Sequence, residues 1–259
     1  MGTILEDVGR LLAHQKPLPT CSLNPYVDSL SSHVQHSRSQ SLDFWKALLR
    51  RFSAPQPLRS YILDPNTGAC IRSVETLELD ISRTILENRS REMKIAHSTV
   101  IYAAWALVLS VYTSSGQVAF GAVLSGRTLP VPGIEHLVAP VINTCPFPVK
   151  LSESTPTLAF LKDIYDQHMA ISDFQWGVAE TVGEIWLDSL GSLFDTVVAI
   201  ECDLSVSTRA NKLGGLHCTI SRQDFPEFKL TLFIELGKDG GLTARAVFDQ
   251  TVLSANDVK

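Results

Sequence analysis

The chain has 259 residues, 45% of them hydrophobic, which suffices for one large domain or two small ones around a substantial core. Its formal net charge is −5, and no run of basic residues is longer than Arg50-Arg51. Nucleic-acid-binding proteins carry a basic patch, so this composition excludes that class of function.

Five cysteines, an odd number, are scattered along the chain without a CxxC pair, and no signal-peptide pattern precedes the first helix. This usage predicts free thiols in a reducing compartment, and we expect a cytoplasmic location. The most apolar helix candidate, residues 100–112, has 13 residues, which is too short to span a bilayer. We therefore interpret it as a helix buried inside a soluble protein.

Two amphipathic helices are predicted near the amino end. The first covers residues 3–12 and has one apolar face, with Thr3 and a glutamate three residues later forming a capping box. Such a face needs a partner surface. A proline-spaced connector over residues 16–30 follows, and a second helix, residues 41–52, is predicted behind an N-cap at Ser41.

From about residue 69 the pattern becomes that of a mixed α/β (α+β) domain. Helices are predicted at residues 97–113 and 157–171, the latter with Thr155 as N-cap and Pro156 at the first helical position. A GKDGG turn indicates a hairpin, and Ser254 is the expected cap of a short last helix. Because helices and strands do not alternate strictly, we expect a large, mostly antiparallel sheet flanked by helices. Strand character is present in residues 70–79, 117–126, 193–203, 216–222, 228–236 and 242–248.

The most informative segment is FGAVLSGRTLPVPGIEHLVAPVINTCPFPV, residues 120–149. Its SGR, PVPGIE and INTCP motifs resemble the carboxy-terminal lobe of nonribosomal peptide synthetase condensation domains, particularly those of fungal type. The resemblance implies a chloramphenicol-acetyltransferase-like lobe over residues 69–259. It also implies that residues 1–68 are helices and a connector like the segment between the family's two lobes. Other landmarks follow the family's order and extend the resemblance over nearly the whole chain, at residues 24–33, 42–49, 98–121 and 192–201.

Pro146 and Pro148 stand two residues apart in a segment with strand character. The resemblance implies that the backbone here leaves one sheet to reach across toward the other lobe. We therefore expect the ladder pairing to end at these prolines. Asn143 and Thr144, just before them, would then bond the freed backbone groups.

The resemblance also identifies what this sequence lacks. The family's catalytic motif, HHxxxDG, lies in the amino-terminal lobe, just upstream of a helix like the one at residues 3–12. None of the seven histidines is in that frame, Ala139 replaces a usual glycine, and Pro148 replaces a common arginine. We interpret the chain as a truncated member of the family, from which ordinary amide-bond condensation is not expected. The histidines are residues 14, 33, 36, 97, 136, 168 and 217.

Three functional hypotheses remain open. The first is a stand-alone enzyme of natural-product biosynthesis that promotes cyclisation or rearrangement of a polyketide- or peptide-derived substrate in a tunnel-like pocket. The second is a non-catalytic lobe that docks a synthetase partner or a carrier-bound intermediate, and the third is an inactive remnant. For both functional hypotheses we expect self-association or a companion synthetase chain, because an isolated lobe exposes apolar surface. Nucleotide-binding, nucleophile-elbow and metal-ligand motifs are absent, so no cofactor is expected.

The catalytic candidates are Glu201, Asp203 and His168. Strand alternation puts the two carboxylates on one face with Asp195, where they form either a polar cavity wall or an ordinary solvent-facing surface. His168 has an unperturbed pKa near working pH, as a general acid or base requires, although a core or helix-surface histidine explains it equally. Cys145 is interpreted as a buried hydrophobic thiol rather than a nucleophile.

Five residues are candidates for binding substrate, and most have a structural alternative. Arg127 suits the anchoring of backbone carbonyls or a pair with Glu135 as well as it suits an anion. Trp176 and Trp186 either line an apolar pocket or pack in the core. The substrate-binding candidates are Asn143, Thr144, Arg127, Trp176 and Asp195.

Overall fold

A computed structural model of the chain describes residues 2–50, 52, 72–178, 194–202, 228–237 and 240–258. Its centre is a six-stranded sheet in the order β1-β6-β5-β4-β2-β3. Strand β4 runs parallel to both of its neighbours, and the other three pairings are antiparallel. The expected mixed fold with a mostly antiparallel sheet is confirmed. The strands are β1 (Arg72–Glu78), β2 (Gln117–Ser125), β3 (Ile142–Lys150), β4 (Thr196–Cys202), β5 (Leu230–Leu236) and β6 (Leu242–Asp249).

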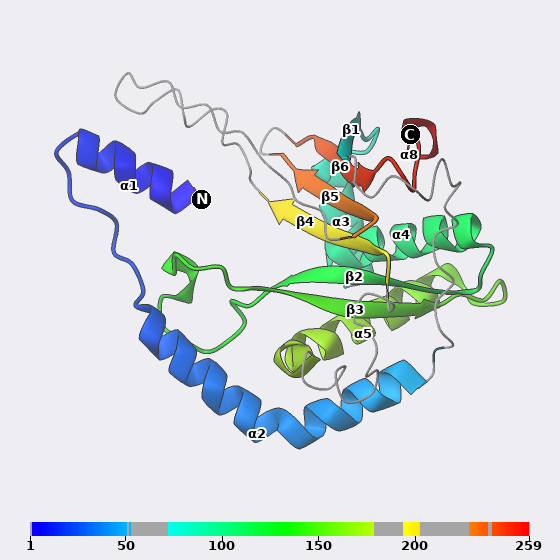
Figure 1. The fold of residues 1–259 in the computed structure, drawn as a ribbon, viewed down its shortest axis with the longest axis horizontal. Coiled ribbons are helices and arrows are strands. Elements are labelled where there is room, and N and C mark those ends of the chain that lie inside the picture. Colours follow the sequence, from blue (N-terminus) through cyan, green and yellow to red (C-terminus); the bar gives the residue numbers. More distant parts are fainter. Residues whose placement is uncertain are drawn as a thin grey trace.

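Helices α3, α4 and α5 lie on one side of the sheet, and the long helix α2 runs along the outside of α5 (Figure 1). Helix α1 lies apart from the sheet and from the other helices (Figure 1). The helices are α1 (Gly2–Leu12), α2 (Leu23–Arg50), α3 (Arg83–Met93), α4 (His97–Thr113), α5 (Thr157–Phe174) and α8 (Ala255–Val258), with short 3₁₀ turns η1 (Ile134–His136) and η2 (Gln175–Gly177).

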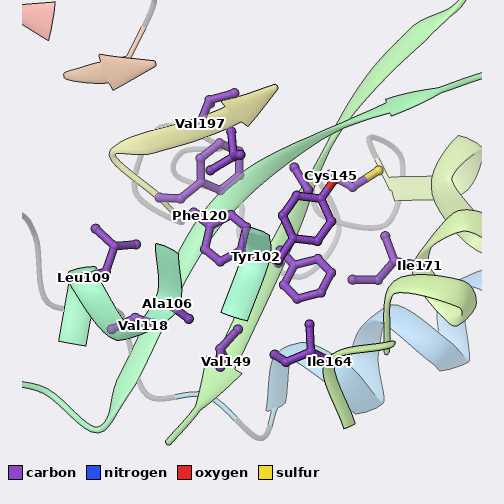
Figure 2. Close-up of a cluster of buried hydrophobic side chains, with 14 of the residues drawn as sticks. Tyr102, Ala106, Leu109, Val118, Phe120, Cys145, Val149, Ile164, Ile171 and Val197 are labelled. Atoms are coloured by element: carbon purple, nitrogen blue, oxygen red, sulfur yellow. The ribbon is translucent and has the colours of Figure 1, made fainter. Parts of the chain in front are cut away.

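The side of the sheet that carries the helices, here called the helical face, holds the main core. Phe120 of β2 stacks on Phe147 of β3 with 5.2 Å between the ring centroids, and Tyr102 of α4 packs on both rings. Each of these three side chains is at most 2% exposed. Figure 2 shows Tyr102 and Phe120 surrounded by aliphatic side chains of α4, α5 and the strands. Such ring pairs add about 0.5–1.5 kcal/mol each beyond their buried area, so they hold α4 against β2 and β3.

The opposite side, here called the second face, is less buried. Along β2, Phe120 and Leu124 are buried on the helical face, whereas Ala119 and Val123 on the second face are half-buried. The same alternation continues through β5, where Ile234 is buried and Phe233 and Glu235 are half-buried. Successive strand residues point to opposite faces, so the second face is the more polar and more accessible one.

The two prolines of β3 are explained by the strand order. Pro146 pairs with Gly121 and Pro148 with Ala119, so the ladder runs through both prolines and the expected end of pairing there is wrong. Strand β3 is the edge of the sheet, and a proline is tolerated where its missing N–H would point outward. The outward carbonyl of Pro148 accepts a hydrogen bond from Gln167 Nε2 of α5 at 2.7 Å.

Helix α2 is longer than the sequence predicted. It begins at Leu23 rather than behind Ser41. Pro25 is tolerated because it lies in the first turn, where a backbone N–H has no intrahelical partner to lose. Ser41 is therefore mid-helix and 2% exposed. Trp45, one turn further on, is fully buried, and its Nε1 donates to the carbonyl oxygen of Phe174 at 3.1 Å. This contact fixes the carboxyl half of α2 against the end of α5.

Other helix ends agree with the sequence or differ by a residue or two. The expected short last helix is confirmed, since Ser254 Oγ caps the Asp257 N–H while donating to the Asp257 carboxylate. Pro156, not Thr155, is the N-cap of α5, and α1 already includes Thr3. The antiparallel β5–β6 hairpin is also confirmed. The predicted strand at residues 216–222 lies outside the described residues.

Within the part of the chain that the structure describes, no single helix is long and apolar enough to cross a membrane. Helices α3 and α4 pass that test of length and composition only together, and they are bent by 100° at the break between them.

Gly121 offers a test of this packing. A Cβ added there would lie 2.5 Å from Phe194 Cε2 and 2.9 Å from both Thr144 Cγ2 and Val197 Cγ2. We expect Gly121→Ala to lower the free energy of unfolding by about 1–3 kcal/mol, because overpacking between strands forces side chains off their rotamers. Urea unfolding measures this, with Gly116→Ala as control, since its Cβ would only reach Leu151 O at 3.4 Å. Equal losses for the two variants would contradict the packing at Gly121.

Candidate functional site

The loop between β2 and β3, residues 126–141, reaches away from the sheet to the amino half of α2 (Figure 1). It packs there in a small separate core with Tyr26 of α2, which is 4% exposed. Arg127 Nη2 donates to the carbonyl oxygen of Leu137 at 2.9 Å, so its guanidinium anchors the loop. Glu135 instead faces His136, 3.6 Å from its Nε2. Of the roles considered for Arg127, the structure shows backbone anchoring.

Asn143, Cys145 and Trp176 belong to the junction between β3 and η2. Asn143 Nδ2 donates to the carbonyl oxygen of Gln175 at 2.5 Å, and Cys145 Sγ lies 3.8 Å from the same oxygen. The Trp176 ring covers Gly126, leaving no room for a Cβ at that position. Trp176 also packs against the core under the 126–141 loop. These side chains fasten η2 to the sheet, and Trp186 lies outside the described residues.

His168 belongs to α5, and its ring points toward α4 and the helical face of the sheet. Its ring meets Tyr102 edge to face with 5.2 Å between centroids, and its Nδ1 lies 3.5 Å from Ser98 Oγ. Burial lowers the pKa of His168 below the ordinary 6.5, so the ring is neutral at neutral pH. The sheet separates this imidazole from the second face.

The second face carries a row of polar side chains across β4, β5 and β6. The register places Glu201 beside Glu235, and Glu235 beside Thr243. Arg245 Nε donates to Glu235 Oε1 at 2.9 Å, and its guanidinium carbon lies 4.1 Å from the centre of the Phe233 ring. Arg245 is only 12% exposed at its side chain, so this ion pair is well shielded and holds a fixed geometry.

The sequence candidates therefore divide into separate groups. Thr144 of β3 and Glu201 of β4 share the second face, as the register and the contacts around Gly121 require. Asp195 precedes β4 and binds Lys229 Nζ at 2.9 Å, which ties the starts of β4 and β5 together. His168 lies behind the sheet, so the structure does not bring it together with Glu201. Asp203 lies outside the described residues.

Sequence reasoning missed Glu235 and Arg245. Both were visible as charged residues inside strand-like segments, 228–236 and 242–248. These strands come near β4 only through the order of the sheet, in which β5 lies next to β4 and β6 lies next to β5. Among the described residues no group of histidine, cysteine, aspartate or glutamate is arranged to hold a metal ion.

A mixed six-stranded sheet with helices on one face and a more polar second face agrees with the expected lobe of the chloramphenicol-acetyltransferase type. The sequence model described as "Condensation domain" matches residues 1–259. The chain belongs to the condensation-domain family.

Known relatives agree with this assignment. The nonribosomal peptide synthetase tcpP of Claviceps purpurea is 29% identical over 239 residues, 91% of this chain and 12% of the relative. Nonribosomal peptide synthetase 5 of Aspergillus fumigatus is 31% identical over 212 residues, 78% of this chain and 9% of the relative. The chain thus spans about a tenth of these curated relatives.

Solved structures show the same fold at low sequence identity. The cyclization-docking bidomain of EpoB from Sorangium cellulosum has a TM-score of 0.74 and 20% identity, covering 92% of this chain and 50% of that one. The first condensation domain of the calcium-dependent antibiotic synthetase has a TM-score of 0.70 and 13% identity, covering 98% and 57%. The chain corresponds to about half of each of these structures.

The buried His168 predicts a pH dependence of stability. Its pKa is lowered in the folded protein, so the unfolded chain takes up the proton first as the pH falls through 6.5. The contribution of His168 to the free energy of unfolding is therefore complete above that pH. It is lost as the pH falls toward the pKa of His168 in the folded protein. We expect His168→Gln to flatten the loss of unfolding free energy between about pH 7.5 and about pH 5 in urea titrations. His136→Gln, at a 61% exposed side chain, is the matched control, and equal flattening by the two variants would contradict this role of His168.

Burial raises the pKa of the Cys145 thiol to about 12, which predicts that it is chemically inert. At about pH 8 only about one in ten thousand such thiols is ionised, and the thiolate is the reactive form. Iodoacetamide should therefore modify the exposed Cys202 in the native protein and Cys145 only after unfolding. Peptide mass mapping over time measures this. Modification of Cys145 within about tenfold of the Cys202 rate would contradict the prediction.

Proposed function

We propose that this chain works as the carboxy-terminal lobe of a condensation domain in secondary-metabolite biosynthesis. In this role the second face forms one wall of a channel for carrier-tethered substrates. The observation that carries the proposal is the polar row on that face, in which Glu201 lies beside the Glu235–Arg245 ion pair. The described helices all lie on the other side of the sheet or outside it (Figure 1). The family assignment and the half-length match to condensation-domain structures support it.

In a condensation step, an amine nitrogen bonds to a thioester carbonyl carbon, the C–S bond breaks and the amine loses a proton. The Arg245 guanidinium is held by Glu235 and by the Phe233 ring, so it shapes the wall rather than moving with the reaction. Glu201 can accept a hydrogen bond from a substrate amine and hold it in place. This sequence has no HHxxxDG motif, so the group that receives the proton would come from an amino-terminal lobe.

Helix α1 supports the need for a second lobe. Four of its apolar side chains are largely exposed, from 40% at Val8 to 56% at Leu11, and the helix stands clear of the sheet (Figure 1). An unpartnered amphipathic helix of this kind requires a covering surface. We infer that an amino-terminal lobe, in a longer chain or a companion chain, covers it, with a second copy of this chain as the alternative partner. The exposed apolar residues of α1 are Ile4, Val8, Leu11 and Leu12.

Cyclisation or rearrangement without amide formation is the second candidate. It is favoured by the Glu201 carboxylate, which lies beside the Glu235–Arg245 ion pair and can orient and stabilise a cationic or polar intermediate without a histidine. Orientation of a folded substrate supplies much of the rate in such reactions. His168 has no part in this version, since the sheet lies between it and these carboxylates.

Replacing the gene in its source organism by a Glu201→Gln allele tests the proposed wall. Metabolite profiling should show the peptide-derived product reduced about tenfold, because one charge-assisted hydrogen bond to the substrate is lost. Glu153→Gln, in the exposed turn between β3 and α5, is the matched control and should leave the product unchanged. Equal product yields from the two alleles, with both proteins folded, would contradict the proposed role of Glu201 and of the second face in binding substrate.

Complete deletion of the gene separates the two candidate reactions. Loss of the product together with accumulation of its unjoined precursors supports the condensation role. Replacement of the product by an isomer of equal mass supports cyclisation or rearrangement. An unchanged profile in cells that normally express the protein would contradict both.

A further inference from the structure

A hollow far from the second face lies at the bend between α3 and α4. It has a volume of about 770 Å³, is open to solvent and is bordered on one side by α5. The two helices meet there at 100°, so the carboxyl end of α3 and the amino end of α4 both face it. The proposed function uses none of its residues.

The amino end of α4 is uncapped. Its N-cap, Ala96, has an extended backbone with ψ of 148° and no side chain that could accept from the first-turn N–H groups. Helix α4 is 17 residues long, so its first turn concentrates a positive partial charge next to the hollow. His97, the first helical residue, lines the hollow as well. This end of the helix suits an oxyanion.

Ser90 gives an independent indication of a ligand. It lines the hollow from the last turn of α3, is only 3% exposed, and its Oγ has no hydrogen-bond partner among the described residues. Burying a hydroxyl without a partner costs about 1–3 kcal/mol, so such groups normally have one. A ligand oxygen in the hollow would accept its hydrogen.

The charges around the hollow are mainly positive. Arg91 and Lys94 line it and are exposed, with Arg91 Nη1 donating to Asn88 Oδ1 at 2.9 Å. Glu87 also lines it, but this carboxylate accepts from Arg83 Nε at 2.7 Å. The hydrogen bond from Arg83 is also the main cause of the lowered pKa of Glu87. With Glu87 compensated by Arg83, two cations and the helix end are left to face a ligand.

The hollow also offers apolar surface. Ile95, Tyr165 and Met169 line it, and the last two come from α5. Anion donors on α3 and α4 together with apolar surface on α5 fit a small organic phosphate rather than inorganic phosphate alone.

We propose that the hollow between α3, α4 and α5 binds a small phosphomonoester. Its phosphate oxygens accept from Ser90 Oγ and from the N–H groups of His97 and Ser98 at the start of α4, whose Thr99 N–H donates to Ala96 O at 3.0 Å. Lys94 and Arg91 supply charge, and the organic part contacts Tyr165 and Met169.

Lys94 makes a discriminating test possible. It follows α3 in a left-handed conformation with φ of 56°, where glycine is favoured. Lys94→Gly therefore removes the cation while relieving backbone strain, so a loss of binding cannot be attributed to unfolding. Ser90→Ala removes the unpartnered hydroxyl, which also should not destabilise the fold. Arg89→Gln is the matched control, because it removes a charge from α3 outside the hollow, where Arg89 pairs with Glu92 at 3.0 Å.

Isothermal titration of the full chain with phenyl phosphate should show one saturable site. We expect Kd to rise about tenfold in Lys94→Gly and by at least about threefold in Ser90→Ala, and to stay unchanged in Arg89→Gln. Inorganic phosphate and benzoate should each bind more weakly than phenyl phosphate, since each lacks one half of the recognised ligand. The melting temperature of Lys94→Gly should equal or exceed that of the parent.

Several results would overturn the proposal. They are the absence of saturable binding, equal affinity for benzoate and phenyl phosphate, and equal weakening by Arg89→Gln and Lys94→Gly. Co-sedimentation with vesicles containing phosphatidic acid, without binding of phenyl phosphate in solution, would assign the hollow to a lipid headgroup and reject a free small ligand.

Discussion

The stacked rings of Phe120 and Phe147, with Tyr102 packed on both, determine which way the side chains of the sheet point. Strand side chains alternate strictly, so once these rings face α4 and α5, the neighbours of each strand must face the opposite side. A shift of one residue would move the aromatic rings into solvent and bury Glu201 under the helices. The register of the core is therefore what creates a polar second face.

The edge position of β3 and the length of α2 follow from the same packing. Gln167 of α5 satisfies the outward carbonyl of Pro148, so the edge is covered by the helix that the aromatic core holds in place. Trp45 then connects α2 to the last turn of α5. Asn143 and Trp176 fasten the next turn, η2, to the sheet and to the 126–141 loop. Side chains that resembled a substrate site in sequence are here used for assembly.

The two proposed sites use opposite sides of the molecule and different chemistry. The second face presents a shielded ion pair and a carboxylate on rigid strands, which suits the orientation of a tethered substrate. The hollow at the α3–α4 bend presents a helix amino end, a buried hydroxyl and two cations, which suits an anion. Because the sheet and α4 separate them, variants in one site should leave the other intact, and each proposal can fail alone.

The sequence by itself determined the family, the mixed fold and most elements, because the motif block at residues 120–149 and the local hydrophobic periods are properties of short segments. It also determined that the HHxxxDG motif is missing. Only the tertiary structure decided that β3 is an edge strand, that His168 and Glu201 lie on opposite sides of the sheet, and that Arg245 and Glu235 join Glu201. These facts depend on strand order and register, and those are set by contacts between residues far apart in the chain, which no local pattern encodes.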